Sequence, residues 1–228
     1  MYRLHIANKN YSSWSLRPWV LMTALEIPFE EWMLRFGDTR AWADYRQRVS
    51  RAGQVPCLED GNIVVWDSLS IAEYLAERHR GVWPEQAAAR AWARSAAAEM
   101  HSGFSELRSC CSMTCGLRIR LREFPNALER DLTQLGALWN DGLRRFGGPF
   151  LAGPEFTAAD AFFAPVAFRV QTYMLPLDPA SMAYVTQLLE LPAMRAWYDD
   201  ALRETFRDDP HEQETRRIGT VLTDFRAR

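Results

Sequence analysis

Four hydroxyl side chains lie close together near the start of the chain: Tyr11, Ser12, Ser13 and Ser15. They follow an alternating apolar run over residues 2–7, which is typical of a strand, and they precede apolar positions at helical spacing. A serine at such a point is commonly a helix cap. The same hydroxyl can instead donate a hydrogen bond to an anion, which the positive end of the helix dipole would favour.

A second polar group surrounds a predicted β-hairpin. Two short apolar runs flank a Gly-Asn turn at 61–62, and the second run ends at Asp67 and Ser68, directly before a helical pattern. Pro56 heads the first strand, where its missing N–H need not serve the ladder. If the Val55–Pro56 bond is cis, the Val55 N–H and C=O face outward and can pair with an extended peptide. The helix start near Ser68 favours a carboxylate, so the hairpin predicts a strand edge beside an anion site.

These residues carry a family resemblance. Gln54, Val55 and Pro56, together with Asp67 and Ser68 at the helix start, resemble the glutathione-binding half of the thioredoxin-like domain in cytosolic glutathione transferases. The resemblance implies that Val55 pairs with the cysteinyl backbone of glutathione, with Gln54 and Pro56 beside it. It also implies that Asp67 and Ser68 hold the γ-glutamyl group.

The hydroxyl cluster resembles the Ser-Ser-Cys-Ser signature of zeta-class transferases, the maleylacetoacetate isomerases. This implies that Ser12 is the catalytic serine and Ser13 its neighbouring hydroxyl, although Trp14 stands where zeta enzymes carry cysteine. A free thiol with a pKa of about 8.5 is mostly protonated at neutral pH, so a hydroxyl that donates to the sulfur would favour the thiolate. Ser12 and Ser15 also occupy the Cys-x-x-Cys positions of thioredoxins and glutaredoxins. Disulfide exchange through a protein thiol is therefore not expected.

The pocket for a second substrate is expected at the start of the C-terminal half. Its candidate residues are Tyr11, Trp14, His101, Met113 and Cys115. In the family that the chain resembles, the first long helix of this half borders the cleft, so apolar and sulfur side chains there suit a hydrophobic co-substrate. His101 could act on a proton, but a lone helical histidine is more often structural. Arginines such as Arg108 could bind an anionic substrate, but arginines on helices are usually solvated.

The element pattern divides the chain into two domains. Residues 1–80 read as an α/β thioredoxin-like domain in the order β-α-β-α-β-β-α with a mixed sheet, and residues 81–84, Gly-Val-Trp-Pro, read as a linker. Residues 85–228 read as an all-α helical domain. The resemblance to glutathione transferases extends over residues 2–204.

Within the helical domain, long helices are expected over 85–109 and 126–146. Thr157 and Asp160 open a further helix as a capping-box-like motif, in a stabilising role without substrate contact. Shorter helices follow near 181–189 and 192–204. The polar tail from residue 205 either folds back over the cleft or stays mobile.

Composition narrows the classes of partner. Residues 1–80 hold ten acidic and ten basic side chains and the remainder nineteen and seventeen, which argues against a nucleic-acid partner. No apolar run reaches the roughly eighteen residues of a membrane helix, so a cytoplasmic protein without a membrane partner is expected. The cysteines are few and clustered, which indicates reduced thiols; their spacing matches no zinc pattern, so no metal site is expected. They are Cys57, Cys110, Cys111 and Cys115.

The motifs together predict a glutathione transferase that activates glutathione as a thiolate for attack on a small hydrophobic electrophile. Glutathione is then a co-substrate, and the resemblance implies a homodimer. Two other reactions stay open, a glutathione-dependent cis–trans isomerisation and peroxide removal. A different class also stays open, a transferase-like binding module without turnover, but Val55, Pro56, Asp67 and Ser68 favour an enzyme.

Overall fold

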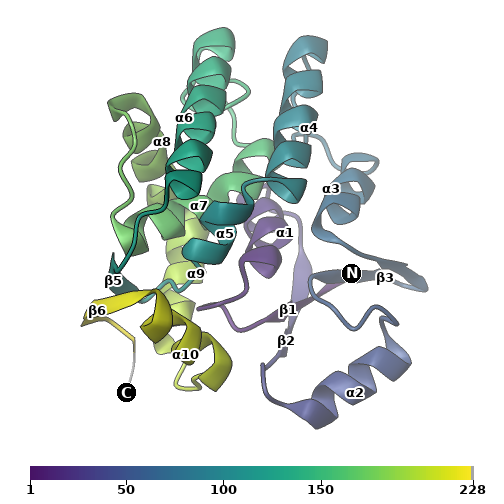
Figure 1. The fold of residues 1–228 in the computed structure, drawn as a ribbon. Coiled ribbons are helices and arrows are strands. Elements are labelled where there is room, and N and C mark those ends of the chain that lie inside the picture. The colour runs from purple at the N-terminus through teal and green to yellow at the C-terminus, as the bar shows by residue number, and fades with distance from the viewer. Residues whose placement is uncertain (227–228) are drawn as a thin grey trace.

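A computed structural model describes residues 1–226 of the chain. The N-terminal part is built on a four-stranded sheet in the order β2-β1-β3-β4. The strands are β1 (Tyr2–Ala7), β2 (Phe29–Leu34), β3 (Cys57–Asp60) and β4 (Ile63–Val65). β1 and β2 are parallel, as predicted, whereas β3 runs antiparallel to both β1 and β4. The mixed sheet and its helices confirm the thioredoxin-like fold class (Figure 1).

Helix α1 (Ser13–Ala24) crosses from β1 to β2, as a parallel strand pair requires. Its N-cap is Ser12. We expected the helix to start late enough for Pro18 to fall in its first turn, and this was wrong, because Pro18 lies in the second turn. A proline there leaves the carbonyl of Trp14 without its usual helical N–H partner.

Two further helices complete this part: α2 (Thr39–Arg48) and α3 (Ser68–Ala76). The hairpin before α3 turns at Gly61, whose φ of 59° explains the glycine. Asp67 caps α3, because its carboxylate accepts the backbone N–H of Leu69 at 2.9 Å. Asp67, rather than Ser68, is therefore the capping residue.

The C-terminal part is mainly helical, which confirms the predicted helical domain; its one small sheet is described below. Its first six helices are α4 (Ala87–Ser102), α5 (Ser105–Cys110), α6 (Asn126–Phe146), α7 (Ala158–Tyr173), α8 (Pro179–Glu190) and α9 (Pro192–Arg203). The expected single helix over 85–109 was wrong, because the chain breaks between α4 and α5. Phe104 there has a left-handed backbone with φ 52°, and a side chain on Gly103 would meet the carbonyl oxygen of Glu99. The break turns α5 out of line with α4.

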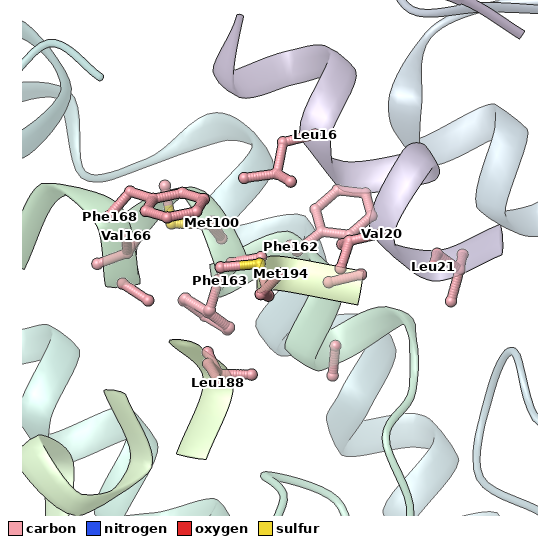
Figure 2. Close-up of a cluster of buried hydrophobic side chains, with 14 of the residues drawn as sticks. Leu16, Val20, Leu21, Met100, Phe162, Phe163, Val166, Phe168, Leu188 and Met194 are labelled. Carbon is pink, nitrogen blue, oxygen red and sulfur yellow. The ribbon is translucent and has the colours of Figure 1, made fainter. Parts of the chain in front are cut away.

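The two parts share one hydrophobic core around α1 and α7. Figure 2 shows Leu16 and Val20 of α1 lying toward Phe162 and Phe163 of α7, with Met194 of α9 between them. These side chains are buried almost completely. Because α1 also carries Ser12 at its start, the packing of α7 fixes the position of that residue.

The start of α7 contains the predicted capping box between Thr157 and Asp160. The Asp160 carboxylate is fully buried and accepts the backbone N–H groups of Thr157 and Leu151 at 2.9 and 3.0 Å. It also accepts the hydroxyls of Tyr184 at 2.9 Å and Thr157 at 3.2 Å. One carboxylate thus ties α7 to α8 and to the preceding loop.

The polar tail folds back onto the protein, which agrees with the first of the two alternatives for this segment. It forms helix α10 (Asp209–Ile218) and strand β6 (Gly219–Asp224). β6 pairs antiparallel with β5 (Leu117–Leu121), a two-stranded sheet that the sequence did not lead us to expect (Figure 1). Arg118 and Arg120 lie on β5. Residues 227 and 228 of the predicted tail lie outside the described residues.

Within residues 1–226, none of the helices combines the length and the apolar character needed to cross a bilayer.

Candidate functional site

A cavity of about 910 Å³ lies where β1, the hairpin and α5 approach one another. It is lined by nine of the twelve residues that the sequence assigned to the site: Tyr11, Ser12, Ser13, Trp14, Gln54, Val55, Pro56, Asp67 and Met113. Ser68, His101 and Cys115 do not line it. The two separate sequence motifs, around Ser12 and around Val55, therefore face one space.

Ser12 is held by a short chain of hydrogen bonds. Its hydroxyl donates to Ser15 Oγ at 2.7 Å, and Ser15 Oγ accepts the backbone N–H of Ala7 at 3.1 Å. Because hydroxyl hydrogens rotate, Ser15 can donate to Ser12 whenever Ser12 donates into the cavity. The Ser13 hydroxyl has no hydrogen-bond partner within residues 1–226. Two hydroxyls and the positive end of α1 therefore face the cavity.

The Val55 peptide forms an open strand edge. The Val55–Pro56 bond is cis, as the sequence analysis considered. Within the described chain, neither the N–H nor the C=O of Val55 has a hydrogen-bond partner. The preceding residue is fixed, because Tyr45 donates its hydroxyl to the Gln54 carbonyl at 2.9 Å. An extended peptide in the cavity could satisfy both groups of Val55.

Asp67 and Ser68 differ in their position relative to the cavity. Asp67 lines it, with its second carboxylate oxygen 3.3 Å from His101 Nε2. Ser68 is buried, and its hydroxyl accepts from Arg17 Nη1 at 3.4 Å. Burial, with the nearby charges of Arg17 and Arg108, lowers the pKa of His101 despite the opposing charge of Asp67. His101 thus contacts Asp67 and does not line the cavity, so its expected place in the co-substrate pocket was wrong.

Cys115, which was expected near a co-substrate, and the nearby Cys111 are both buried and do not line the cavity. Cys115 is completely buried and its thiol lies 3.4 Å from the carbonyl oxygen of Lys9. Burial raises the pKa of both thiols, that of Cys111 to about 12, so neither is a thiolate at neutral pH. Assigning Cys115 to the pocket was wrong, because the chain after α5 folds inward against α7, where Thr172 donates to the Thr114 carbonyl at 2.8 Å.

The C-terminal segment contributes to the site, which the sequence did not specify. The ring of His211 in α10 stacks on Tyr11 with centroids 4.8 Å apart and lines the cavity. The Tyr11 hydroxyl donates to Glu212 at 2.7 Å, and Arg226 pairs with Glu212 and contacts the same hydroxyl. Tyr11 is therefore committed to this network. Its O–H already donates to Glu212, so it is not available as a donor to a thiol, and burial and Glu212 raise its pKa.

The rest of the loop between β1 and α1 is also held from far along the chain. Lys9 Nζ contacts Glu31 and Asp200, each at 2.8 Å, and the Lys9 carbonyl accepts from Trp197 at 3.0 Å. The backbone N–H groups of Lys9 and Asn10 donate to the Glu204 carboxylate. The loop that carries the hydroxyl cluster is thus fixed by the C-terminal part.

Acid should release the C-terminal segment. Burial alone would raise the pKa of Glu212 and of Asp224, but hydrogen bonds from Arg226 outweigh it and lower both. Since unfolded values lie at about 4, the stabilisation is present above about pH 4 and is lost as the pH falls through the folded pKa values.

Protection factors for amide hydrogen exchange, which correct for the intrinsic pH dependence of the exchange rate, should accordingly fall in α10 on acidification before they fall in α7. The variant Glu212→Gln should show faster α10 exchange at neutral pH. Glu214→Gln, two residues along the same helix and outside this network, is the matched control. Equal exchange in the two variants would contradict the role given to Glu212.

Two arginines and the carboxylate of Glu214 in α10 form the remaining charged part of the wall. Arg108 of α5 and Arg169 of α7 both line the cavity. From the sequence, we considered Arg108 as one of several arginines and did not single out Arg169. A charged residue inside the otherwise apolar run of α7 was a readable signal, because arginine is rarely buried without a reason.

Among residues 1–226, no cluster of three or more histidine, cysteine, aspartate or glutamate side chains could hold a metal ion.

Comparison with known proteins agrees with this arrangement. The chain matches the family model described as Glutathione S-transferase, N-terminal domain, over residues 11–78, and the one described as Glutathione S-transferase, C-terminal domain, over residues 85–200. A dichloromethane dehalogenase of Methylorubrum extorquens is 36% identical over 61 residues, which are 26% of this chain and 21% of that enzyme. The match thus spans about a fifth of that relative.

Solved structures show the same fold. A glutathione transferase homologue from Burkholderia gl BGR1, with bound glutathione, aligns with a TM-score of 0.65 at 20% identity, over 88% of this chain and 97% of that one. A glutathione transferase from Methylococcus capsulatus aligns with a TM-score of 0.66 at 21% identity, over 88% and 98%. At these identities the likeness concerns the fold.

Proposed function

The chain belongs to the glutathione S-transferase family, and on that basis we propose that it binds glutathione and activates it as a thiolate for attack on a small electrophile. Ser12 donates to the sulfur, in a serine-type mechanism, and Ser13 is the neighbouring hydroxyl. The positive end of α1 adds to the stabilisation of the anion. The thiol proton leaves to solvent.

One observation carries the proposal: the unpaired N–H and C=O of Val55 face the same cavity as Ser12. A cysteinyl backbone paired with Val55 would place its side chain within that cavity. Asp67 is available at the cavity wall for the ammonium of the γ-glutamyl group, and the start of α3 at Ser68 for its carboxylate. Gln54 and Pro56 complete this edge.

The positions of the cavity-lining residues along the chain suggest a role for each domain. We assign glutathione binding to residues 1–80 and the larger share of the co-substrate pocket to residues 85–228. Met113 supplies apolar surface from that domain, and Trp14 and the ring of Tyr11 add apolar surface from residues 1–80. Family membership further supports a cytoplasmic homodimer, whose mass sedimentation would measure.

Glutathione affinity tests the proposal directly. Titration calorimetry should detect glutathione binding to the wild type, and Asp67→Ala should weaken it about 10-fold, because a hydrogen bond to a charged group is lost. Asp67 is also a helix cap, so part of any loss could come from a weakened α3.

Asp38→Ala separates the two effects. Asp38 is also an N-cap aspartate: it caps α2, its carboxylate accepting the N–H of Ala41 three residues on at 3.0 Å, but it does not line the cavity. It should lose similar stability and retain glutathione affinity. No detectable glutathione binding by the wild type would refute the proposal.

A further inference from the structure

The α5 and α7 side of the cavity is more polar than a site for a purely hydrophobic substrate. α5 presents Ser105, Arg108 and Ser109 to it, at the spacing that puts three residues on one helix face. Arg169 of α7 lines the same space. Within residues 1–226 no carboxylate forms an ion pair with Arg108 or Arg169.

Arg169 is an unusually placed cation. Its side chain is only 5% exposed, and its one hydrogen bond runs from Nε to the Cys111 carbonyl at 2.8 Å. The two Nη atoms have no partner in the described chain. Burial, and to a lesser extent the charge of Arg108, lowers the pKa of Arg169 to about 10, which still leaves it charged at neutral pH.

Two more contacts extend this positive region. Arg108 and Arg17 both lie against the ring of Trp14, at 4.8 and 4.3 Å from its centroid. Arg17 is buried and its Nε has no partner among the described residues. Positive charges that lie this close together and are shielded from water repel one another strongly unless an anion is present, because the protein interior screens charges poorly. Arg108 and Arg169 line the cavity, so an anion bound there can reach these two guanidinium groups.

The apolar residues that line the same cavity define the rest of the ligand. Trp14, Phe36 and Trp42 line the cavity with aromatic surface, and Met113 adds a flexible apolar side chain. Such a wall accepts a flat apolar body, while a guanidinium accepts a planar carboxylate through paired hydrogen bonds.

We infer that Arg108 and Arg169 form an anion subsite for the second substrate, which is an electrophile with an aromatic body and a carboxylate. This rests on the proposed function, since it assigns the substrate class of that same site. The sequence predicted a small hydrophobic electrophile. The subsite keeps the apolar body of that substrate and adds a negative charge to it.

The carboxylate that binds these arginines could alternatively belong to glutathione rather than to the second substrate. Arg17 does not line the cavity, but it lies next to the proposed site of the γ-glutamyl group, because it donates to Ser68 at the start of α3. Arg169 instead contacts Cys111, at the end of α5, where Ser112 and Met113 continue the co-substrate wall. We therefore assign Arg169 to the second substrate, and the experiment separates the two sources.

A pair of matched substrates gives the test: a chloronitrobenzoate and the corresponding neutral chloronitrobenzamide. In each reaction the glutathione sulfur forms a bond to the ring carbon, the carbon–chlorine bond breaks, chloride leaves and the thiol proton goes to solvent. Rates of each compound with free glutathione correct for their different intrinsic reactivity. After that correction, the wild type should prefer the benzoate about 10-fold or more in kcat/KM.

Arg169→Gln and Arg108→Gln should each lower kcat/KM for the benzoate about 10- to 100-fold and change the benzamide less than about 3-fold. Glutathione affinity, measured by calorimetry, should stay unchanged. Arg169→Lys should keep part of the benzoate preference. Arg120→Gln on strand β5, exposed and outside the cavity, is the matched control and should change neither substrate.

Arg108→Gln keeps the test decisive if the buried Arg169→Gln variant does not fold. Equal losses on both substrates, or weakened glutathione binding in the Arg108 and Arg169 variants, would overturn the assignment to the second substrate. If the wild type neither binds glutathione nor accelerates either reaction, the proposed function falls together with the subsite. If it binds glutathione and turns over both substrates without discrimination, the subsite alone falls.

Discussion

Replacing Ser12 by alanine is expected to lower kcat/KM about 10²- to 10³-fold at neutral pH, the usual effect of removing one donor to a developing or resident anion. The hydroxyl would otherwise donate to the glutathione sulfur, and its loss removes a hydrogen bond to a charged group. Such a bond corresponds to roughly one to two pKa units of the bound thiol. Ultraviolet absorbance of the thiolate, titrated with pH in the complex, measures that pKa directly.

Two comparisons make the result specific. Ser13→Ala, which removes a hydroxyl from the same cavity, should cost less than about 10-fold, because Ser12 alone is braced by Ser15. The Ser12→Ala defect should also shrink as the pH rises, since alkali restores the thiolate that the serine no longer favours. An unchanged thiol pKa in Ser12→Ala would remove Ser12 from the mechanism.

The largest effect on folding is expected from Asp160→Ala. The change strands four donors inside the protein: the N–H groups of Leu151 and Thr157 and the hydroxyls of Thr157 and Tyr184. Each buried donor left unpaired costs about 1–3 kcal/mol, partly offset because the buried carboxylate is gone. We expect the free energy of unfolding to fall by about 4 kcal/mol, measured by denaturant titration with the slope checked for two-state behaviour.

Asp178→Ala is the matched control for that experiment. Asp178 also accepts four hydrogen bonds, two from the backbone at the start of α8 and two from Asn140 and Ser181 side chains, but it is exposed. Water can take the place of the Asp178 carboxylate as hydrogen-bond acceptor. The free energy of unfolding is therefore expected to fall by only about 1 kcal/mol, the usual size of a lost helix cap. Similar losses in the two variants would show that burial does not set the cost at Asp160.

Local patterns in the sequence were sufficient for most of the fold. Strand 2–7 and helix 126–146 were predicted with the bounds that the structure has, because each has a clear period and a clear stop signal. The capping box at Thr157 was also found, since it depends on residues three apart. The bend at Phe104 was missed because strong helix formers stand on both sides of it.

Contacts between distant segments account for what was missed in the site. The pairing of β5 with β6 joins residues about a hundred positions apart, and neither strand has a strong local signal. His211 and Glu214 reach the cavity only through that fold-back. Cys115 was misplaced for the same reason, since no local pattern tells which way the chain turns after α5. Arg169 lies in a helix buried on all sides, so periodicity assigns it no face.

The loop from Lys9 to Tyr11 has a consequence for how the protein assembles. Its partners at residues 197–226 follow it by 188 to 215 positions, among the largest separations of any hydrogen bonds in residues 1–226. At a synthesis rate of about 5–20 residues per second, the loop leaves the ribosome roughly 10 to 40 s before those partners exist. The β-sheet can form earlier, because its strands are close in sequence. Ser12 therefore reaches its working position among the last events of folding, and recovery of activity on refolding should report docking of the C-terminal helices rather than formation of the sheet that carries the serine.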